Sequence, residues 1–104
     1  MTTVQYTCAR SSNRINGSLE GDAAWFEFHH VAQLFGVRLE QATKVLRIAS
    51  ARGEVAQAID VRNSGSKDYH LSHRAVIAVG YHLDYGRATA FRYWCAAELT
   101  ELLN

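Results

Sequence analysis

The 104-residue sequence contains no proline, only two cysteines and no long apolar run. A membrane-spanning helix needs roughly 18 consecutive apolar residues, so we expect no transmembrane segment. Cys8 and Cys95 are too few for the disulfide framework of a small secreted protein. The opening segment MTTVQYTCAR has no charged flank followed by an apolar stretch, so we expect no secretory signal. These absences favour a protein of the reducing cytoplasm.

The sequence also has little net charge, because 11 Lys and Arg oppose 10 Asp and Glu to give +1. A dedicated nucleic-acid-binding domain usually carries a larger basic excess. A nucleic-acid partner would therefore have to meet a local basic patch. Hydrophobic residues make up 48% of the chain, and two Trp, five Tyr and four Phe residues can anchor a core. This balance is typical of one globular domain and excludes disorder as the main state.

Catalytic and metal-binding motifs are missing as well. The chain has no CxxC or HExxH motif, no GxSxG motif and no glycine-rich phosphate loop. His29 and His30 are adjacent and are expected to point to different faces of a helix. His70 and His73 straddle the boundary between an expected strand and an expected helix. The sequence therefore predicts a protein that is not an enzyme and has no cofactor and no metal site.

Three strands are predicted near the N-terminus. Residues 4–8 alternate between apolar and polar side chains, which is typical of a strand with one buried face. Residues 15–20 and 23–26 predict two further strands, joined by a turn at Gly21. These strands would form a small sheet at the start of the domain.

The pattern then changes to helical spacing. Residues 28–35 predict a first helix, and Gly36 is typical of a helix C-terminus. A second helix follows after a very short connection. Its expected inward stripe is Leu39, Ala42, Val45, Leu46 and Ala49. Two short helices joined by a tight glycine turn are typical of a helix-turn-helix.

A β-hairpin and two helices complete the chain. Residues 55–62 alternate well and predict a strand, 63–66 a turn, and 67–71 the returning strand. Ser72 is a favourable N-cap for the next helix, and the last helix is expected to run to about residue 103.

The predicted fold class is α+β, a winged helix-turn-helix-like domain with a small N-terminal sheet, a β-hairpin wing and two C-terminal helices. Residues 1–104 form a single domain, in which 1–26 hold the N-terminal strands, 27–52 the helix-turn-helix, 54–71 the hairpin wing and 72–104 the C-terminal helices. In such a domain the second helix enters the DNA major groove, and the hairpin lies along the sugar-phosphate backbone of the DNA.

Two blocks of sequence resemble the RhuM family of bacterial and phage-borne proteins. They are Val79-Gly80-Tyr81 followed by Arg87-Ala88-Thr89, Phe91-Arg92 and Trp94, and the earlier Ala32-Gln33-Leu34-Phe35-Gly36-Val37. Trp25 also sits where that family has a tryptophan before its first helix. The resemblance covers most of the chain, from about Ala23 to Leu103. It implies a small winged DNA-binding regulator of the kind encoded on prophages and mobile elements, and it implies no enzymatic activity.

Six residues are the candidate DNA contacts. On the second helix they are Gln41, Thr43, Lys44 and Arg47, and beside the hairpin turn they are Arg62 and Lys67. Lysine and arginine side chains bind phosphates, and arginine can also pair with a guanine edge. The competing interpretation is a solvated helix face and an ordinary exposed hairpin.

Four further charged residues lie at or near the helices of the expected fold. Glu27 and Arg38 occupy the positions before the two helices of the helix-turn-helix, where both are poor caps. Arg87 and Arg92 are expected to pair with a nearby carboxylate such as Asp84 or Asp68, with a second phosphate contact as the alternative.

The sequence thus favours a transcription regulator that binds double-stranded DNA as a homodimer. The alternative is a protein-interaction module on the same scaffold, such as an inhibitor or antitoxin-like partner of another protein. The expected dimer seam is the end of the last helix, at Leu99, Leu102 and Leu103.

Overall fold

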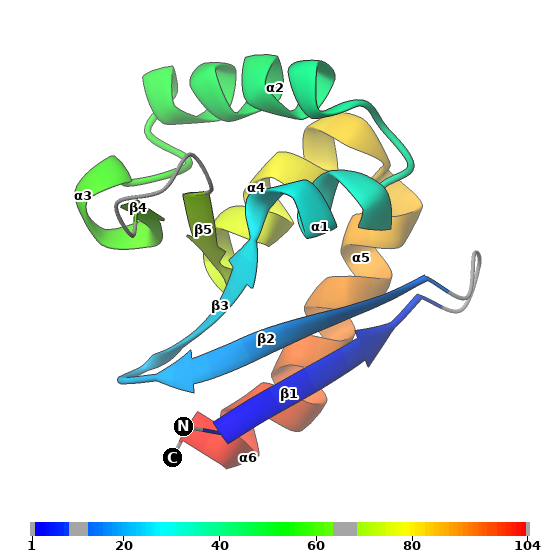
Figure 1. Ribbon diagram of the computed structural model, residues 1–104, viewed down its shortest axis with the longest axis vertical. Coiled ribbons are helices and arrows are strands. Elements are labelled where there is room, and N and C mark those ends of the chain that lie inside the picture. Colours follow the sequence, from blue (N-terminus) through cyan, green and yellow to red (C-terminus); the bar gives the residue numbers. More distant parts are fainter. Residues whose placement is uncertain (1, 9–12, 64–68, 104) are drawn as a thin grey trace.

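The computed structural model describes residues 2–8, 13–63 and 69–103 (Figure 1). The strands are β1 (Thr2–Thr7), β2 (Arg14–Glu20), β3 (Ala23–Glu27), β4 (Val61–Asn63) and β5 (Tyr69–Ser72). The helices are α1 (Phe28–Leu34), α2 (Leu39–Ala51), α3 (Gln57–Asp60), α4 (His73–Leu83), α5 (Tyr85–Trp94), the π-helical segment η1 (Cys95–Leu99) and α6 (Thr100–Leu103). The predicted α+β class is confirmed.

All five strands belong to one antiparallel sheet with the order β1-β2-β3-β5-β4. The three predicted N-terminal strands are confirmed, and Gly21 turns the chain between β2 and β3 at a φ of 65°. The expected division into a small N-terminal sheet and a separate hairpin is wrong. Strand β5 pairs with β3, with Phe26 opposite Leu71, so the hairpin extends the N-terminal sheet.

The predicted strand over residues 55–62 is also wrong. Only Val61–Asn63 is extended, and Gln57–Asp60 forms the short helix α3. The reason is Asp60, whose carboxylate is buried and accepts a hydrogen bond from the Ala56 N–H at 3.2 Å. This bond closes a tight turn and leaves the large apolar side chain of Ile59 65% exposed. The hairpin is therefore much shorter than the alternation indicates.

Helices α4 and α5 and the segments after them cover one face of the sheet (Figure 1). Phe91 of α5 is fully buried, with its ring 5.0 Å from that of Tyr6 and 5.6 Å from that of Phe26. Both cysteines are buried in this core, as expected for small apolar side chains. Burial raises the pKa of the Cys95 thiol to about 12.

The C-terminal helical run is confirmed to residue 103, with a π-helical turn inside it. Asp84 caps its start, because its Oδ1 accepts from the Arg87 N–H at 3.1 Å. Leu99 is only 1% exposed and packs into the core of its own chain, which removes it from the expected dimer seam. Leu102 is 53% exposed and stays available to a partner.

Gly80 of α4 allows a close contact between helical segments, because it has no side chain. A Cβ at this position would lie 2.4 Å from Cζ of Phe35 and 2.9 Å from Cβ of Ala88. Phe35 follows α1 and Ala88 belongs to α5, so this glycine lets three helices meet at one point. The two sequence blocks that carry the family resemblance contact each other here.

We expect Gly80→Ala to destabilise the protein by about 1–3 kcal/mol, because the added methyl group overpacks this junction. Helix propensity alone would give the opposite sign, since alanine is favoured over glycine in a helix by roughly 1 kcal/mol. Urea unfolding decides between the two. In the double variant Gly80→Ala, Phe35→Leu, the loss of unfolding free energy should be smaller than the sum of the losses in the two single variants. A Gly80→Ala protein that is more stable than the wild type would contradict the packing described here.

Candidate functional site

The turn between α1 and α2 is held by an arginine from α5. The Arg87 guanidinium donates from Nη1 to the Leu34 carbonyl at 3.1 Å and pairs with Asp84 through Nε at 3.4 Å. Gly36 lies directly under it, at a φ of 68°, and a Cβ there would meet Nη1 at 3.0 Å. The expected structural role of Arg87 is confirmed. It satisfies a carbonyl at the end of α1 that has no partner within the helix.

Helix α2 lies at the opposite end of the molecule from α6 and the two chain termini (Figure 1). Ala42, Leu46 and Ala49 are buried, so three of the five residues of the expected inward stripe are confirmed. Val45 is partly buried and packs against the core, whereas Leu39 is 50% exposed, which corrects its expected inward position. The buried face of the helix packs on α4, while Leu39 lines a hollow between α2 and the hairpin.

The candidate contact residues on α2 lie on its open side. Gln41, Lys44 and Arg47 are exposed, whereas the Thr43 hydroxyl donates to the Leu39 carbonyl at 2.8 Å. Lys44 and Arg47 are three residues apart and are therefore neighbours on the helix surface. The structure thus places three of the four candidate side chains in solvent and uses the fourth inside the helix.

The hairpin residues behave differently. Arg62 pairs with Glu20 at 2.8 Å, and its guanidinium lies 3.8 Å from the centre of the Trp25 ring. Its charge is already balanced within the sheet. Lys67, the other candidate contact beside the turn, lies outside the described residues.

The unpaired basic charge is concentrated around α2. Of the nine described Lys and Arg residues, four contact an acidic, carbonyl or hydroxyl partner: Arg62, Arg74, Arg87 and Arg92. The other five make no ion pair within the described ranges, and four of these are exposed in α2 or at its ends: Arg38, Lys44, Arg47 and Arg52. The fifth, Arg14, lies on β2. Glu40 is the one carboxylate between residues 38 and 52.

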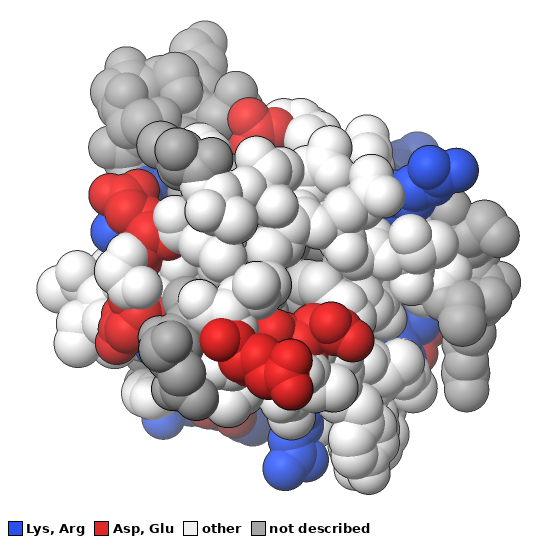
Figure 2. All heavy atoms as spheres, turned by 90° about the horizontal axis from the view of Figure 1, so that it is seen from below, with Lys and Arg blue, Asp and Glu red and all other residues white. Residues whose placement is uncertain are grey.

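The end of the molecule that carries α6 has the opposite character. Figure 2 views this end, and carboxylates gather near the centre of the visible face while basic side chains lie at its edges. The exposed Glu98 and Glu101 belong to the last helical segments. Although the net charge is only +1, unpaired basic side chains therefore lie at the end of the molecule that carries α2, and exposed carboxylates lie at the end that carries α6.

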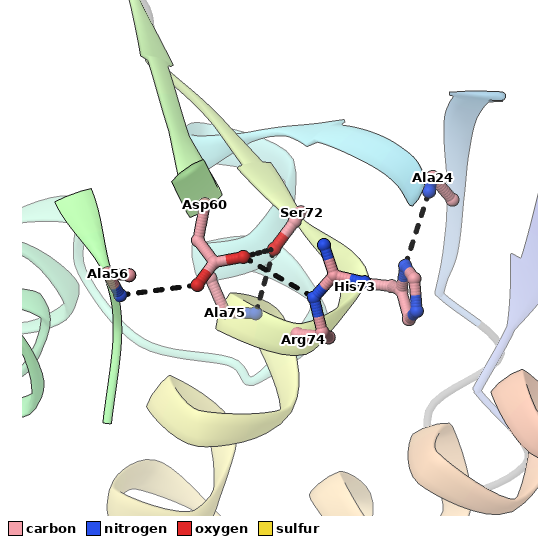
Figure 3. Close-up of polar contacts among 7 residues, drawn as sticks. All are labelled: Ala24, Ala56, Asp60, Ser72, His73, Arg74 and Ala75. Carbon is pink, nitrogen blue, oxygen red and sulfur yellow. Dashed lines mark hydrogen bonds and ion pairs between the residues drawn. The ribbon is translucent and has the colours of Figure 1, made fainter. Parts of the chain in front are cut away.

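A network around Asp60 fixes the hairpin beside α2 (Figure 3). Its carboxylate accepts from the Ser72 hydroxyl at 2.8 Å and lies 3.5 Å from Nε of Arg74. The Ser72 oxygen in turn accepts from the Ala75 N–H at 3.2 Å, which confirms Ser72 as the N-cap of α4. The end of α3 is thus tied to the start of α4.

A hollow of about 250 Å³ separates α2 from the hairpin. Its lining residues are Phe28, His29, Leu39, Thr43, Leu46, Arg47, Gln57, Val61 and Tyr69. The structure therefore brings Thr43 and Arg47 to the same groove as the start of β4 and of β5.

The imidazoles of His29 and His30 lie together, contrary to the expectation that they point to different faces. Their ring centres are 4.2 Å apart, and Oε2 of Glu27 lies 3.5 Å from Nε2 of His29 and 3.2 Å from Nδ1 of His30. Glu27 is the residue before α1 and makes no capping hydrogen bond, so its carboxylate is turned toward the two histidines. The sequence signal is the run Glu27-Phe28-His29-His30, which matches no standard metal motif.

Comparison with protein-family models, curated proteins and solved structures gives no match. None of the helices in the described part of the chain is long and apolar enough to span a membrane.

His73, next to the Asp60 network, gives the fold a dependence on pH. Its Nδ1 accepts from the Ala24 N–H at 3.2 Å (Figure 3), so the ring is neutral in this arrangement. Burial, followed by the nearby Arg74 charge, lowers the pKa of His73 below its usual 6.5. In the unfolded chain the ring takes up its proton near the usual value.

We expect the free energy of unfolding to fall as the pH decreases from about 7 through this lowered pKa, because the unfolded state binds the proton first in that window. His73→Asn keeps an acceptor for the Ala24 N–H but cannot titrate, so its loss of stability on acidification should be smaller. Urea unfolding of both proteins at several pH values measures the difference, with the surface variant His82→Asn as control. Identical pH dependence in the wild type and His73→Asn would contradict this assignment.

Proposed function

We propose that this chain is a DNA-binding regulator that presents α2 to the major groove of double-stranded DNA. The observation that carries the proposal is the set of four exposed and unpaired cations at α2, defined above, while the arginines of the hairpin and C-terminal helices are engaged within the fold. Unpaired cations along one helix and at its ends attract a polyanion, and the exposed carboxylates of the last helical segments lie at the opposite end of the molecule.

The dimensions of α2 suit this role. Its 13 residues make a rod of about 20 Å, and the major groove of about 12 Å width admits one helix. Lys44 is suited to a phosphate, because its ammonium group is a compact charge on a flexible stem. Arg47 is suited to a guanine edge, because its planar guanidinium can donate two parallel hydrogen bonds. Gln41 can pair with an adenine edge from the preceding turn.

The hairpin β4–β5 takes the place of a short wing in this proposal. Its position beside the groove at α2 supports this assignment. Arg62 must give up its ion pair with Glu20 before it can bind a phosphate. We therefore assign the hairpin a smaller share of the DNA affinity than α2.

The family resemblance supports the same proposal. A RhuM-like regulator of a phage or mobile element would act in the cytoplasm, without enzymatic activity. It would bind as a homodimer, since one domain of this size offers few base contacts and paired half-sites double them. Leu102 of the expected seam is exposed and can contribute to this dimer, and the side chain of Leu103 lies outside the described part of the structure.

The alternative is a protein-interaction module, and exposed apolar side chains near α2 favour it. Leu39 and Ile48 of α2 are 50% and 40% exposed, and Ile59 and Tyr69 beside the groove are 65% and 43% exposed. Salt separates the two candidates. Binding to phosphates weakens steeply as the salt concentration rises, whereas an apolar protein interface changes little.

We expect Lys44→Ala combined with Arg47→Ala to weaken binding to a random-sequence DNA library and to make its salt dependence shallower by about one to two units, since each phosphate contact contributes about 0.9. Both positions are exposed, so stability should change by less than about 0.5 kcal/mol per site. Fluorescence anisotropy over a salt series measures the affinity.

The matched control is Arg14→Ala combined with Arg92→Ala, which removes the same charge from exposed positions outside α2. This control should keep most of the affinity. Equal losses of DNA affinity in the two double variants would show that binding depends only on net charge. An unchanged DNA affinity in the α2 variant would contradict the DNA proposal and favour the protein-interaction module.

A further inference from the structure

Three side chains of mixed donor type meet where β3 passes into α1. Glu27, His29 and His30 each offer one ligand atom, and these three atoms all lie within 4.8 Å of one another. The three side chains are between 37% and 40% exposed, so the cluster lies close to the protein surface. The DNA proposal makes no use of this cluster.

His30 Nδ1 is the atom that requires an explanation. It is buried, and although Glu27 Oε2 is only 3.2 Å away, the pair does not have hydrogen-bond geometry, so this nitrogen has no hydrogen-bond partner in the described part of the chain. A buried polar atom without a partner loses its hydration free energy. A bound cation would accept the nitrogen lone pair and so compensate for the lost hydration free energy.

The spacing of the cluster matches a coordination shell. With metal–ligand bonds of about 2.0–2.1 Å and tetrahedral angles, neighbouring ligand atoms lie about 3.3–3.4 Å apart. Glu27 Oε2 lies 3.2 Å from Nδ1 of His30 and 3.5 Å from Nε2 of His29, so two edges of the tetrahedron already have nearly the required length. We propose that Glu27, His29 and His30 bind a divalent transition-metal ion of the zinc class.

The donor set selects this class of ion. Two imidazole nitrogens and one carboxylate oxygen suit zinc, cobalt and nickel, whereas calcium and magnesium prefer shells made only of oxygen. Three protein ligands leave a fourth position for water. A second hollow, of about 250 Å³, adjoins Glu27 and His30, and His70, which lies opposite Glu27 across β3 and β5, also lines it.

The ion would connect the end of the central strand β3 to the first turn of α1. Because the unfolded chain does not hold the three ligands together, the metal binds the folded state preferentially and raises its thermal midpoint. This effect is independent of any nucleic acid, so the test uses the metal alone.

The experiment titrates the untagged protein with Zn²⁺ in a calorimeter and with Co²⁺ in a spectrophotometer. We expect one ion per chain, visible absorption bands typical of tetrahedral Co²⁺, and a higher thermal midpoint with Zn²⁺. His29→Gln, His30→Gln and Glu27→Gln should each lower the Zn²⁺ affinity at least about tenfold. Far-ultraviolet circular dichroism checks that each variant is folded.

The matched control is His82→Gln, because His82 is an imidazole that faces a single carboxylate, Glu54, at 2.7 Å. This variant should bind Zn²⁺ as the wild type does. Wild-type protein that binds neither ion would overturn the proposal, and so would a folded His29→Gln variant that retains wild-type affinity or a His82→Gln variant that loses it.

Discussion

The contact between Arg87 and the end of α1 determines where α2 lies. Its guanidinium satisfies the Leu34 carbonyl, and only a residue without a Cβ fits beneath it without a close contact, at the positive φ of Gly36. Phe35 enters the space over Gly80 one residue earlier. The turn of the helix pair is therefore fixed by helices that come some fifty residues later in the chain.

Contacts of three arginines within the fold account for the distribution of charge. Arg87 binds a carbonyl and Asp84, Arg74 binds Asp60, and Arg62 binds Glu20. Each of these cations is therefore already paired within the fold. The cations of α2 have no such partners among the described residues. A protein with a net charge of +1 can therefore present a basic surface. This is the physical basis of the proposed DNA contact.

Much of the fold was predictable from local patterns. The alternation near the N-terminus, Gly36 at the end of the first helix and the cap Ser72 each act within a few residues, and each was predicted correctly. The prediction of a strand over residues 55–62 was wrong, because the Asp60 carboxylate accepts a hydrogen bond from Ser72. Ser72 lies twelve residues further along the chain, and the alternation does not reveal this contact.

The candidate site was predicted in part for the same reason. The exposure of Lys44 and Arg47 follows from helical spacing and needs no knowledge of the rest of the fold. The engagement of Arg62 depends on Glu20, which reaches it across the sheet, and the meeting of His29 and His30 depends on the turned carboxylate of Glu27. Long-range contacts of this kind cannot be deduced from spacing.

The most direct test of this account is a nuclear magnetic resonance titration of the ¹⁵N-labelled protein with a short DNA duplex at low salt. Amide signals report the contact surface residue by residue, so the measurement locates the surface without changing any residue. We expect the largest shifts between Arg38 and Arg52, with smaller shifts in β4 and β5 and little change in α6. Shifts centred on the acidic end of the molecule, or no shifts at all, would contradict the account.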